Sequence, residues 1–218
     1  MTAVILNAPW LEFDLGQPMQ VLSWSLNRPG FVTAQRILWR EVRNADLPKD
    51  LDVDAWLGAE LEARQATDAV TLLTSRPLRH VTQSDATVDG IHAHAVATVG
   101  FSNGERVGHR VDRSHADFGT INVGLRVNTG LTQAALLECM SIVVEARTAA
   151  VIEAGHTTPK GVTTGTGTDC VAVAAAEGDT RYAGLHTAVG EAVGRAVYDA
   201  VRQGALDWMK SKEEMGHA

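Results

Sequence analysis

A short segment of glycine and threonine, Thr163–Asp169 (TTGTGTD), has the clearest potential for chemistry. Gly165 and Gly167 allow backbone conformations closed to other residues and let a ligand approach the chain closely. Successive amides in such a loop form an anion-binding concavity, and threonine hydroxyls add further donors. Asp169 stands where the loop enters a predicted strand, a position suited to a functional carboxylate. The alternative is a plain turn whose threonines bond their own backbone.

Two other side chains, Glu145 and His186, are candidates for acid–base catalysis. Glu145 lies on a predicted helix that is apolar at most other positions, so we expect it at the edge of a buried face. A partly buried carboxylate there is suited to general-base catalysis. His186 is expected at a helix N-terminus, whose positive potential favours a neutral imidazole. The alternative for both residues is a surface side chain that faces water.

Ligand types for a metal occur elsewhere, but their spacing matches no known metal motif. These residues are His92 and His94 on one strand face, and His109, Asp112, His115 and Asp117 in a polar loop. We therefore predict no metal site and no cofactor. The sequence also lacks a P-loop and a GxGxxG motif.

The first half of the chain is predicted to consist mainly of strands. Residues 19–27 alternate between two faces, and Leu22, Trp24 and Leu26 are expected to face the core. The turn at Asn27–Gly30 leads into another β-favouring run and predicts a hairpin. The remaining expected elements are a helix at Asp52–Gln65 and strands in Phe31–Val42, Asp68–Ser75 and His80–Phe101.

The second half is predicted to alternate long helices with strands. Thr132 suits the N-cap of a helix that ends near Ala154, and Gly155 suits its C-cap. The other expected elements are strands at Thr120–Val127 and Asp169–Ala175 and a small-residue helix at His186–Arg202. Together these elements predict a single α+β domain over residues 1–218, with helices packed on a mixed or largely antiparallel sheet.

Composition narrows the function classes. The 218 residues are 45% hydrophobic, enough for one substantial core. A formal charge of -7 without a basic cluster argues against nucleic-acid binding. Cys139 and Cys170 lie far apart in apolar segments and are expected to be unpaired, as in a reducing compartment. Neither a signal sequence nor a membrane span is recognisable, so we expect a cytoplasmic protein.

Several segments occur in the order found in a known family. They are LNRPG (Leu26–Gly30), LLTS (Leu72–Ser75), VGFSNGERVG (Val99–Gly108), GTINVGLRVN (Gly119–Asn128), EARTAAVIEAG (Glu145–Gly155), TTGTGTDCVAVA (Thr163–Ala174) and YAGLHTAVGEAVGRAVYDAV (Tyr182–Val201). In this order and spacing the chain resembles the adenosylcobinamide amidohydrolases. It departs from the family pattern at Arg28-Pro29, where paired glycines are usual, and in the polar insert Arg110–Phe118.

The resemblance implies hydrolysis of the amide that joins a propionate arm of the corrin ring to aminopropanol. The products are adenosylcobyric acid and 1-amino-2-propanol, a step in corrinoid salvage. On chemical grounds, Glu145 or Asp169 activates water and His186 or a carboxylic acid protonates the amine, or else a threonine (Thr164, Thr166 or Thr168) attacks. The predicted substrate-binding residues are Asn27, Thr120, Asn122, Thr164, Gly165, Thr166, Gly167 and Thr168.

Two other functions stay open: a corrinoid-binding protein without catalysis, and a metal-dependent hydrolase of another amide. We also predict a homodimer or larger assembly. Gly190 and Gly194 give the last helix a small-residue face, and a corrinoid is large for a cleft in one domain. The alternative is that this face packs on the chain's own sheet.

Overall fold

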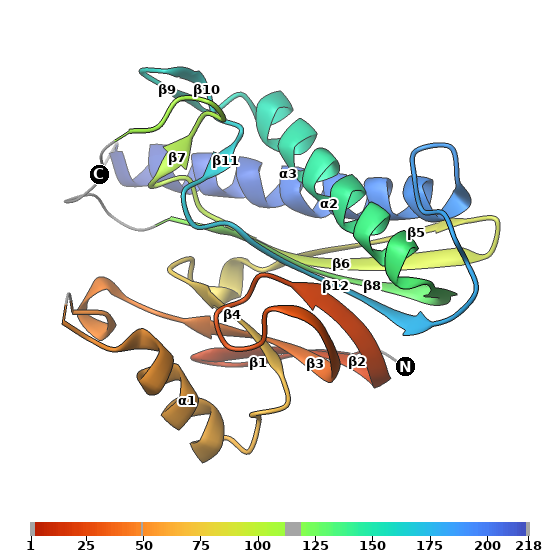
Figure 1. Ribbon diagram of the computed structural model, residues 1–218. Helices are drawn as coiled ribbons and strands as arrows, with labels where there is room; N and C mark the ends of the chain where they lie inside the picture. The colour runs from red at the N-terminus through yellow and green to blue at the C-terminus, as the bar shows by residue number, and fades with distance from the viewer. Residues whose placement is uncertain (1–2, 49, 112–118, 217–218) are drawn as a thin grey trace.

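The computed structural model describes residues 3–48, 50–111 and 119–216, which build one mixed eight-stranded sheet with three α-helices. The strand order is β4-β3-β2-β12-β8-β6-β5, and β1 pairs with β2 (Figure 1). Neighbouring strands are antiparallel except in the pairs β3–β4 and β12–β8, which are parallel. The strands are β1 Ala3–Asn7, β2 Trp10–Ser23, β3 Gly30–Glu41, β4 Val70–Thr74, β5 Thr82–Val88, β6 Ile91–Val99, β8 Ile121–Leu131 and β12 Cys170–Glu177. The α+β prediction with a mixed sheet is confirmed.

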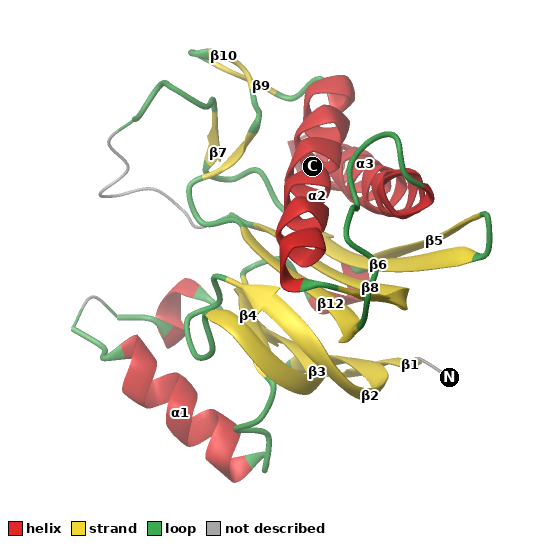
Figure 2. Cartoon of the chain, turned by 45° about the vertical axis from the view of Figure 1, so that its right-hand side comes forward, coloured by secondary structure: helices red, strands yellow, loops and turns green. Residues whose placement is uncertain are grey.

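The helices lie on different parts of the sheet. The helices α2 (Gln133–Ala154) and α3 (Ala188–Gly216) lie side by side over β5, β6, β8 and β12, and α1 (Val53–Ala63) lies beside β3 and β4 (Figure 2). The 3-10 turns are Asn44–Asp46 and Leu78–His80, and the short strands are β7 Gly104–Glu105, β9 Thr157–Thr158, β10 Gly161–Val162 and β11 Gly165–Thr166. The short strands lie outside the main sheet, at the upper left of Figure 1.

The sheet curls, so that β4 approaches β8 although three strands separate them in the sheet order. Asn122 Nδ2 on β8 donates to the Leu73 carbonyl of β4 at 2.6 Å. Inside the curl, Trp39 packs so closely on β8 that a Cβ at Gly124 would lie 2.5 Å from its ring. Glycine is therefore required there, and the curl brings the free edge of β4 near the start of β12.

The predicted ends of α2 are confirmed. The Thr132 hydroxyl accepts a hydrogen bond from the Ala135 amide at 3.2 Å, and Gly155 closes α2 with a φ of 83°. Asp52 caps α1 in the same way, through the Ala55 amide at 3.0 Å. The last helix was predicted too short, because it continues past Arg202 to Gly216. Its polar extension is anchored by Trp208, which is 8% exposed.

The prediction for the first strand is partly wrong. Leu22 is buried, but β2 ends at Ser23, and Trp24 and Leu26 are 46% and 47% exposed. Ser23 at the end of β2 and Ser25 beyond it are buried instead, so the side chains of Trp24 and Leu26 point away from the core.

The small-residue face of α3 packs within the chain. Ala192, Ala196 and Ala200 belong to the core between α2, α3 and the sheet, and a Cβ at Gly190 would collide with the Gly184 carbonyl. This packing is the alternative stated above, so the face no longer supports self-association. The homo-oligomer stays a prediction.

Two further sequence features can be compared with the structure. Cys139 and Cys170 are free thiols, as expected, and burial raises their pKa values to about 12 and about 11. Within the described ranges, no helix is both long and apolar enough to cross a membrane.

Candidate functional site

The Gly/Thr loop runs from the short strand β11 into β12 and is tied to the chain segment before β8. Gly165 pairs with Glu105 of β7, and the Thr164 amide donates to the Glu105 carbonyl at 2.8 Å. The Thr164 hydroxyl accepts a hydrogen bond from the Val107 amide at 2.8 Å. Thr164 and Gly165 are both buried, so they support the loop from beneath.

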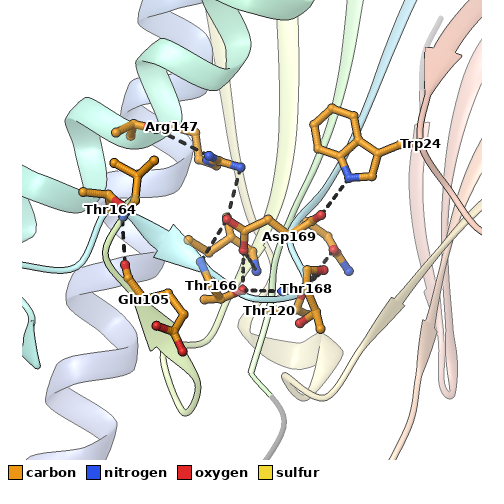
Figure 3. A network of polar contacts seen from close by, with 12 residues as sticks. Trp24, Glu105, Thr120, Arg147, Thr164, Thr166, Thr168 and Asp169 are labelled. Atoms are coloured by element: carbon orange, nitrogen blue, oxygen red, sulfur yellow. Dashed lines mark hydrogen bonds and ion pairs between the residues drawn. The ribbon is translucent and has the colours of Figure 1, made fainter. Parts of the chain in front are cut away.

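Asp169 is the centre of the loop's hydrogen bonds (Figure 3). Its Oδ1 accepts from the Ile121 amide at 3.0 Å and from the Thr166 hydroxyl in a short contact. Its Oδ2 accepts from the Thr166 amide at 3.0 Å and pairs with Arg147 Nη1 at 3.1 Å. Four donors from three parts of the chain therefore fill the acceptor positions of this one carboxylate.

The ion pair between Asp169 and Arg147 is almost fully removed from water, with side-chain exposures of 8% and 12%. Burial raises the pKa of Asp169 because desolvation penalises the charged form. Arg147 and the hydrogen bonds from Thr166 and Ile121 oppose this rise. A buried carboxyl with a raised pKa and a specific charge partner is typical of a functional site.

The end of the loop is fixed by neutral hydrogen bonds. The Thr120 hydroxyl donates to the Thr168 carbonyl at 2.9 Å, and the Thr168 hydroxyl donates to the Gly119 carbonyl at 2.8 Å. Trp24 Nε1 donates to the Asp169 carbonyl at 2.8 Å (Figure 3). The loop is thus attached to the segments that precede β8 and follow β2.

A cavity of about 540 Å³ opens beside this loop, within the range of small-molecule sites. Trp24, Leu26 and Leu72 contribute to its apolar wall, and Thr120, Thr168 and Asp169 contribute polar groups. Gly167 also lines the cavity, and its amide donates no hydrogen bond within the described part of the chain. The arrangement offers a backbone donor and hydroxyls beside a buried carboxylate.

The two glycines of the loop have different roles. A Cβ at Gly165 would lie 2.7 Å from Asp169 Oδ2, so this glycine admits the carboxylate. At Gly167 the nearest atom to such a Cβ is Asn103 Nδ2 at 3.8 Å, an ordinary contact. The sequence suggested that both glycines admit a ligand, and only Gly167 lines the cavity.

The structure separates Glu145 and His186 from this cavity. Both are exposed and line a second depression of about 410 Å³ between α2 and the segment that precedes α3. Glu145 was expected at the edge of a buried face, but it projects away from the face of α2 that carries Arg147. Thr187 rather than His186 caps α3, since its hydroxyl accepts from the Gly190 amide at 3.0 Å.

The two predicted asparagines bond to strand β4 and its flank. Asn27 Nδ2 donates to the Ala69 carbonyl at 2.8 Å, and Asn27 Oδ1 accepts from the Thr71 amide at 3.0 Å. Asn122 is fully buried, and its amide reaches the Leu73 carbonyl. Both side chains hold the wall of the cavity in place.

The histidine pairs lie elsewhere. His92 Nε2 is 3.0 Å from Asp85 Oδ1, and His94 Nε2 is 3.2 Å from Gln83 Oε1, both on the β5–β6 hairpin. Burial lowers the pKa of His94. His109 is exposed, whereas Asp112, His115 and Asp117 lie outside the described residues. Among the residues that are described, no cluster of three or more His, Cys, Asp or Glu could hold a metal ion.

Two site residues were not found from sequence. Arg147 was part of the quoted EAR motif, but nothing local indicates that it pairs with a residue 22 positions later. Trp24 was assigned to the core from alternation alone. An unusually exposed tryptophan next to a polar loop becomes visible only in the fold.

Comparison with known proteins identifies the family of this chain. The family model described as CbiZ, adenosylcobinamide amidohydrolase, matches residues 2–213. The chain belongs to this family. A search of curated proteins found no match. Among solved structures, the PH0078 protein from Pyrococcus horikoshii OT3 aligns with a TM-score of 0.45 and 8% identity, covering 93% of this chain and 82% of that chain.

Proposed function

We propose that this protein hydrolyses the amide of adenosylcobinamide to adenosylcobyric acid and 1-amino-2-propanol, in the cavity beside Asp169. The observation that carries the proposal is that a motif of the family resemblance lies at the wall of a cavity. The TGTGTD segment of the family resemblance borders a cavity of about 540 Å³ and contains its one described carboxyl group. Family membership supports amidohydrolase chemistry, and the cavity supports a site for it.

Asp169 is the proposed acid–base group. A carboxyl with a raised pKa is suited to take a proton from water and return it to the leaving amine. Among its four donors, the Thr166 hydroxyl can rotate away, and this rotation would open Oδ1 to a water molecule. Arg147 keeps the carboxylate in place during the exchange.

The oxyanion of the tetrahedral intermediate needs donors that point into the cavity. The Gly167 amide is the proposed donor, because Gly167 lines the cavity and its amide has no acceptor among the described residues. Thr168 borders the same cavity and can orient the substrate amide through its hydroxyl oxygen.

The attacking group is proposed to be water rather than a threonine. Thr166 donates to a carboxylate, as an activated nucleophile would, but it is not among the residues that line the cavity. Thr168 lines the cavity, but its hydroxyl donates to the Gly119 carbonyl, and a backbone carbonyl cannot act as a general base. Neither threonine combines a base with access to the cavity.

The test is incubation of the purified protein with adenosylcobinamide, followed by liquid chromatography and mass spectrometry. Equal amounts of adenosylcobyric acid and 1-amino-2-propanol are expected, with an oxygen of ¹⁸O-labelled water in the new carboxyl group. A corrinoid-binding protein would retain the ligand with unchanged mass. Absence of both products in the wild-type reaction would refute the proposed function.

A further inference from the structure

The segment that follows β2 places two large apolar side chains at the cavity. Trp24 and Leu26 are 46% and 47% exposed, and both line the cavity. Ser23, which precedes Trp24, and Ser25, which lies between Trp24 and Leu26, are buried. The backbone alternation that buries the serines therefore directs the indole and the leucine towards the opening.

This apolar pair is held rigidly from both ends. The Trp24 indole donates to the Asp169 carbonyl at 2.8 Å, and the Ser23 hydroxyl donates to the Val171 carbonyl at 2.8 Å. At the far end, Asn27 is bonded to both sides of Val70 on β4. An exposed indole fixed before the ligand arrives loses little conformational entropy on binding, which favours affinity.

The size of the cavity limits what can enter it. Pockets of roughly 300–1,000 Å³ bury ligands of drug size. A corrin ring with its amide arms and an adenosyl group is several times larger than such a ligand, whereas the aminopropanol arm is smaller. A cavity of about 540 Å³ can therefore admit the arm, and the ring must rest on the surface outside.

We propose that Trp24 and Leu26 form the contact surface for the corrin ring, so that the ring is recognised at the rim while the amide arm alone reaches the Gly167–Asp169 loop. The inference rests on the proposed function and adds how the substrate is selected. The apolar rim binds the methyl-bearing edge of the macrocycle. The Trp24–Asp169 hydrogen bond fixes the position of this rim relative to the loop that holds the amide.

The experiment measures ring binding and turnover separately. Adenosylcobyric acid carries the ring and its propionate arm but lacks the aminopropanol, so its dissociation constant reports the ring contact without the amide bond that is cleaved. Trp24→Ala is expected to weaken its binding roughly tenfold or more, the scale of a lost aromatic anchor. The KM for adenosylcobinamide should rise by a similar factor, with a smaller change in kcat.

Two variants complete the design. Trp24→Phe retains an aromatic ring without the indole N–H, so it should keep most of the product binding and lower kcat more than it raises KM. Tyr182→Ala removes an aromatic side chain that is 65% exposed before α3, away from the cavity, and should change neither constant. Thermal melting of each variant verifies folding.

The possible outcomes separate the two proposals. If the wild type hydrolyses adenosylcobinamide but Trp24→Ala binds product and substrate normally, the rim contact is refuted and the proposed function stands. If the wild type does not hydrolyse the substrate, the proposed function fails. Binding of adenosylcobyric acid to Trp24→Ala, compared with the wild type, then still decides whether the rim contacts a corrin ring. If the wild type binds no adenosylcobyric acid, the proposed rim contact is refuted.

Discussion

Two depressions on this molecule contain acidic residues that the sequence nominated for catalysis, and they differ in how those residues are held. At the Gly/Thr loop, the side chain of Asp169 is 8% exposed and has four donors. In the depression at α2, Glu145 is exposed. Asp169 and Glu145 are both acidic and both stand in segments of the family resemblance. Burial and hydrogen-bond partners are what distinguish them.

The acid with a structural role in the second depression is Glu138. Its Oε2 accepts from the Ala183 amide at 2.6 Å, and a Cβ at Gly184 would lie 2.6 Å from Oε1. Glu138 thus ties the segment before α3 to α2. The comparison teaches that a carboxylate bonded to one loop amide stabilises a connection, whereas Asp169 joins a loop, a strand and a helix beside a cavity.

The largest effect is expected for Asp169→Asn. The amide cannot act as a base and leaves Arg147 buried without its charge partner, so kcat should fall roughly 10²-fold or more. Breaking a buried ion pair from one side also costs about 3–5 kcal/mol, measurable by urea unfolding.

The double variant Arg147→Met with Asp169→Asn supplies the control for this loss. It should recover part of the stability and none of the turnover, because the two residues interact directly. Normal turnover in folded Asp169→Asn would remove the loop from the mechanism.

The next effect is steric and distinguishes two positions of one loop. Gly165→Ala would place a methyl group 2.7 Å from Asp169 Oδ2, so the carboxylate must move, and we expect a lower melting temperature and reduced turnover. Gly167→Ala meets only Asn103 Nδ2 at 3.8 Å and should leave the melting temperature nearly unchanged. Equal melting temperatures for the two variants would contradict the packing described for Gly165.

A smaller effect concerns pH. Burial raises the pKa of Asp169 above 3.8, so protonation, and loss of the ionised base, begins at a higher pH than for an ordinary aspartate. The acid limb of the kcat profile should therefore have an apparent pKa above 3.8. Residual activity of Asp169→Asn should lack this limb, and an unchanged limb would assign it to another group.

The sign for stability is opposite to that for activity. A carboxyl whose pKa is higher in the folded state takes up a proton on folding, so its own contribution to stability increases as pH falls through the folded pKa. Acid should thus reduce turnover without any loss of stability from the titration of this group.

Local signals in the sequence were sufficient for most of the fold. Thr132 and Gly155 delimit α2 because capping depends on a few neighbouring residues. The end of α3 was missed because the residues after Arg202 are polar, and their helix depends on Trp208 packing with Phe101 and His156. That contact joins three distant segments and leaves no periodic signal.

The candidate site was predictable only in part, for the same reason. Glycine spacing pointed to the loop around Asp169, but the expected reason was wrong, because neither Gly165 nor Gly167 has a positive φ. Gly165 is needed because a Cβ there would lie 2.7 Å from Asp169 Oδ2. The partner of Asp169 was not predictable, since Arg147 lies on α2 and meets the loop only after the chain has folded. Helical spacing could have shown that Arg147 and Glu145 face different sides, but it could not show which side meets the loop.

The smallest effect is predicted for the second depression, and it is the sharpest test of the comparison. Glu145→Gln and His186→Ala each alter an exposed side chain, and neither residue lines the cavity beside Asp169. Surface changes of this kind usually alter stability by less than about 0.5 kcal/mol. We expect kcat and KM for adenosylcobinamide within about twofold of wild type, because neither residue lines the cavity proposed for the amide arm. Steady-state kinetics on both variants and on the double variant would decide the matter. A fall of roughly 10²-fold in kcat, with native melting behaviour, would transfer acid–base catalysis from the buried carboxylate to the exposed pair.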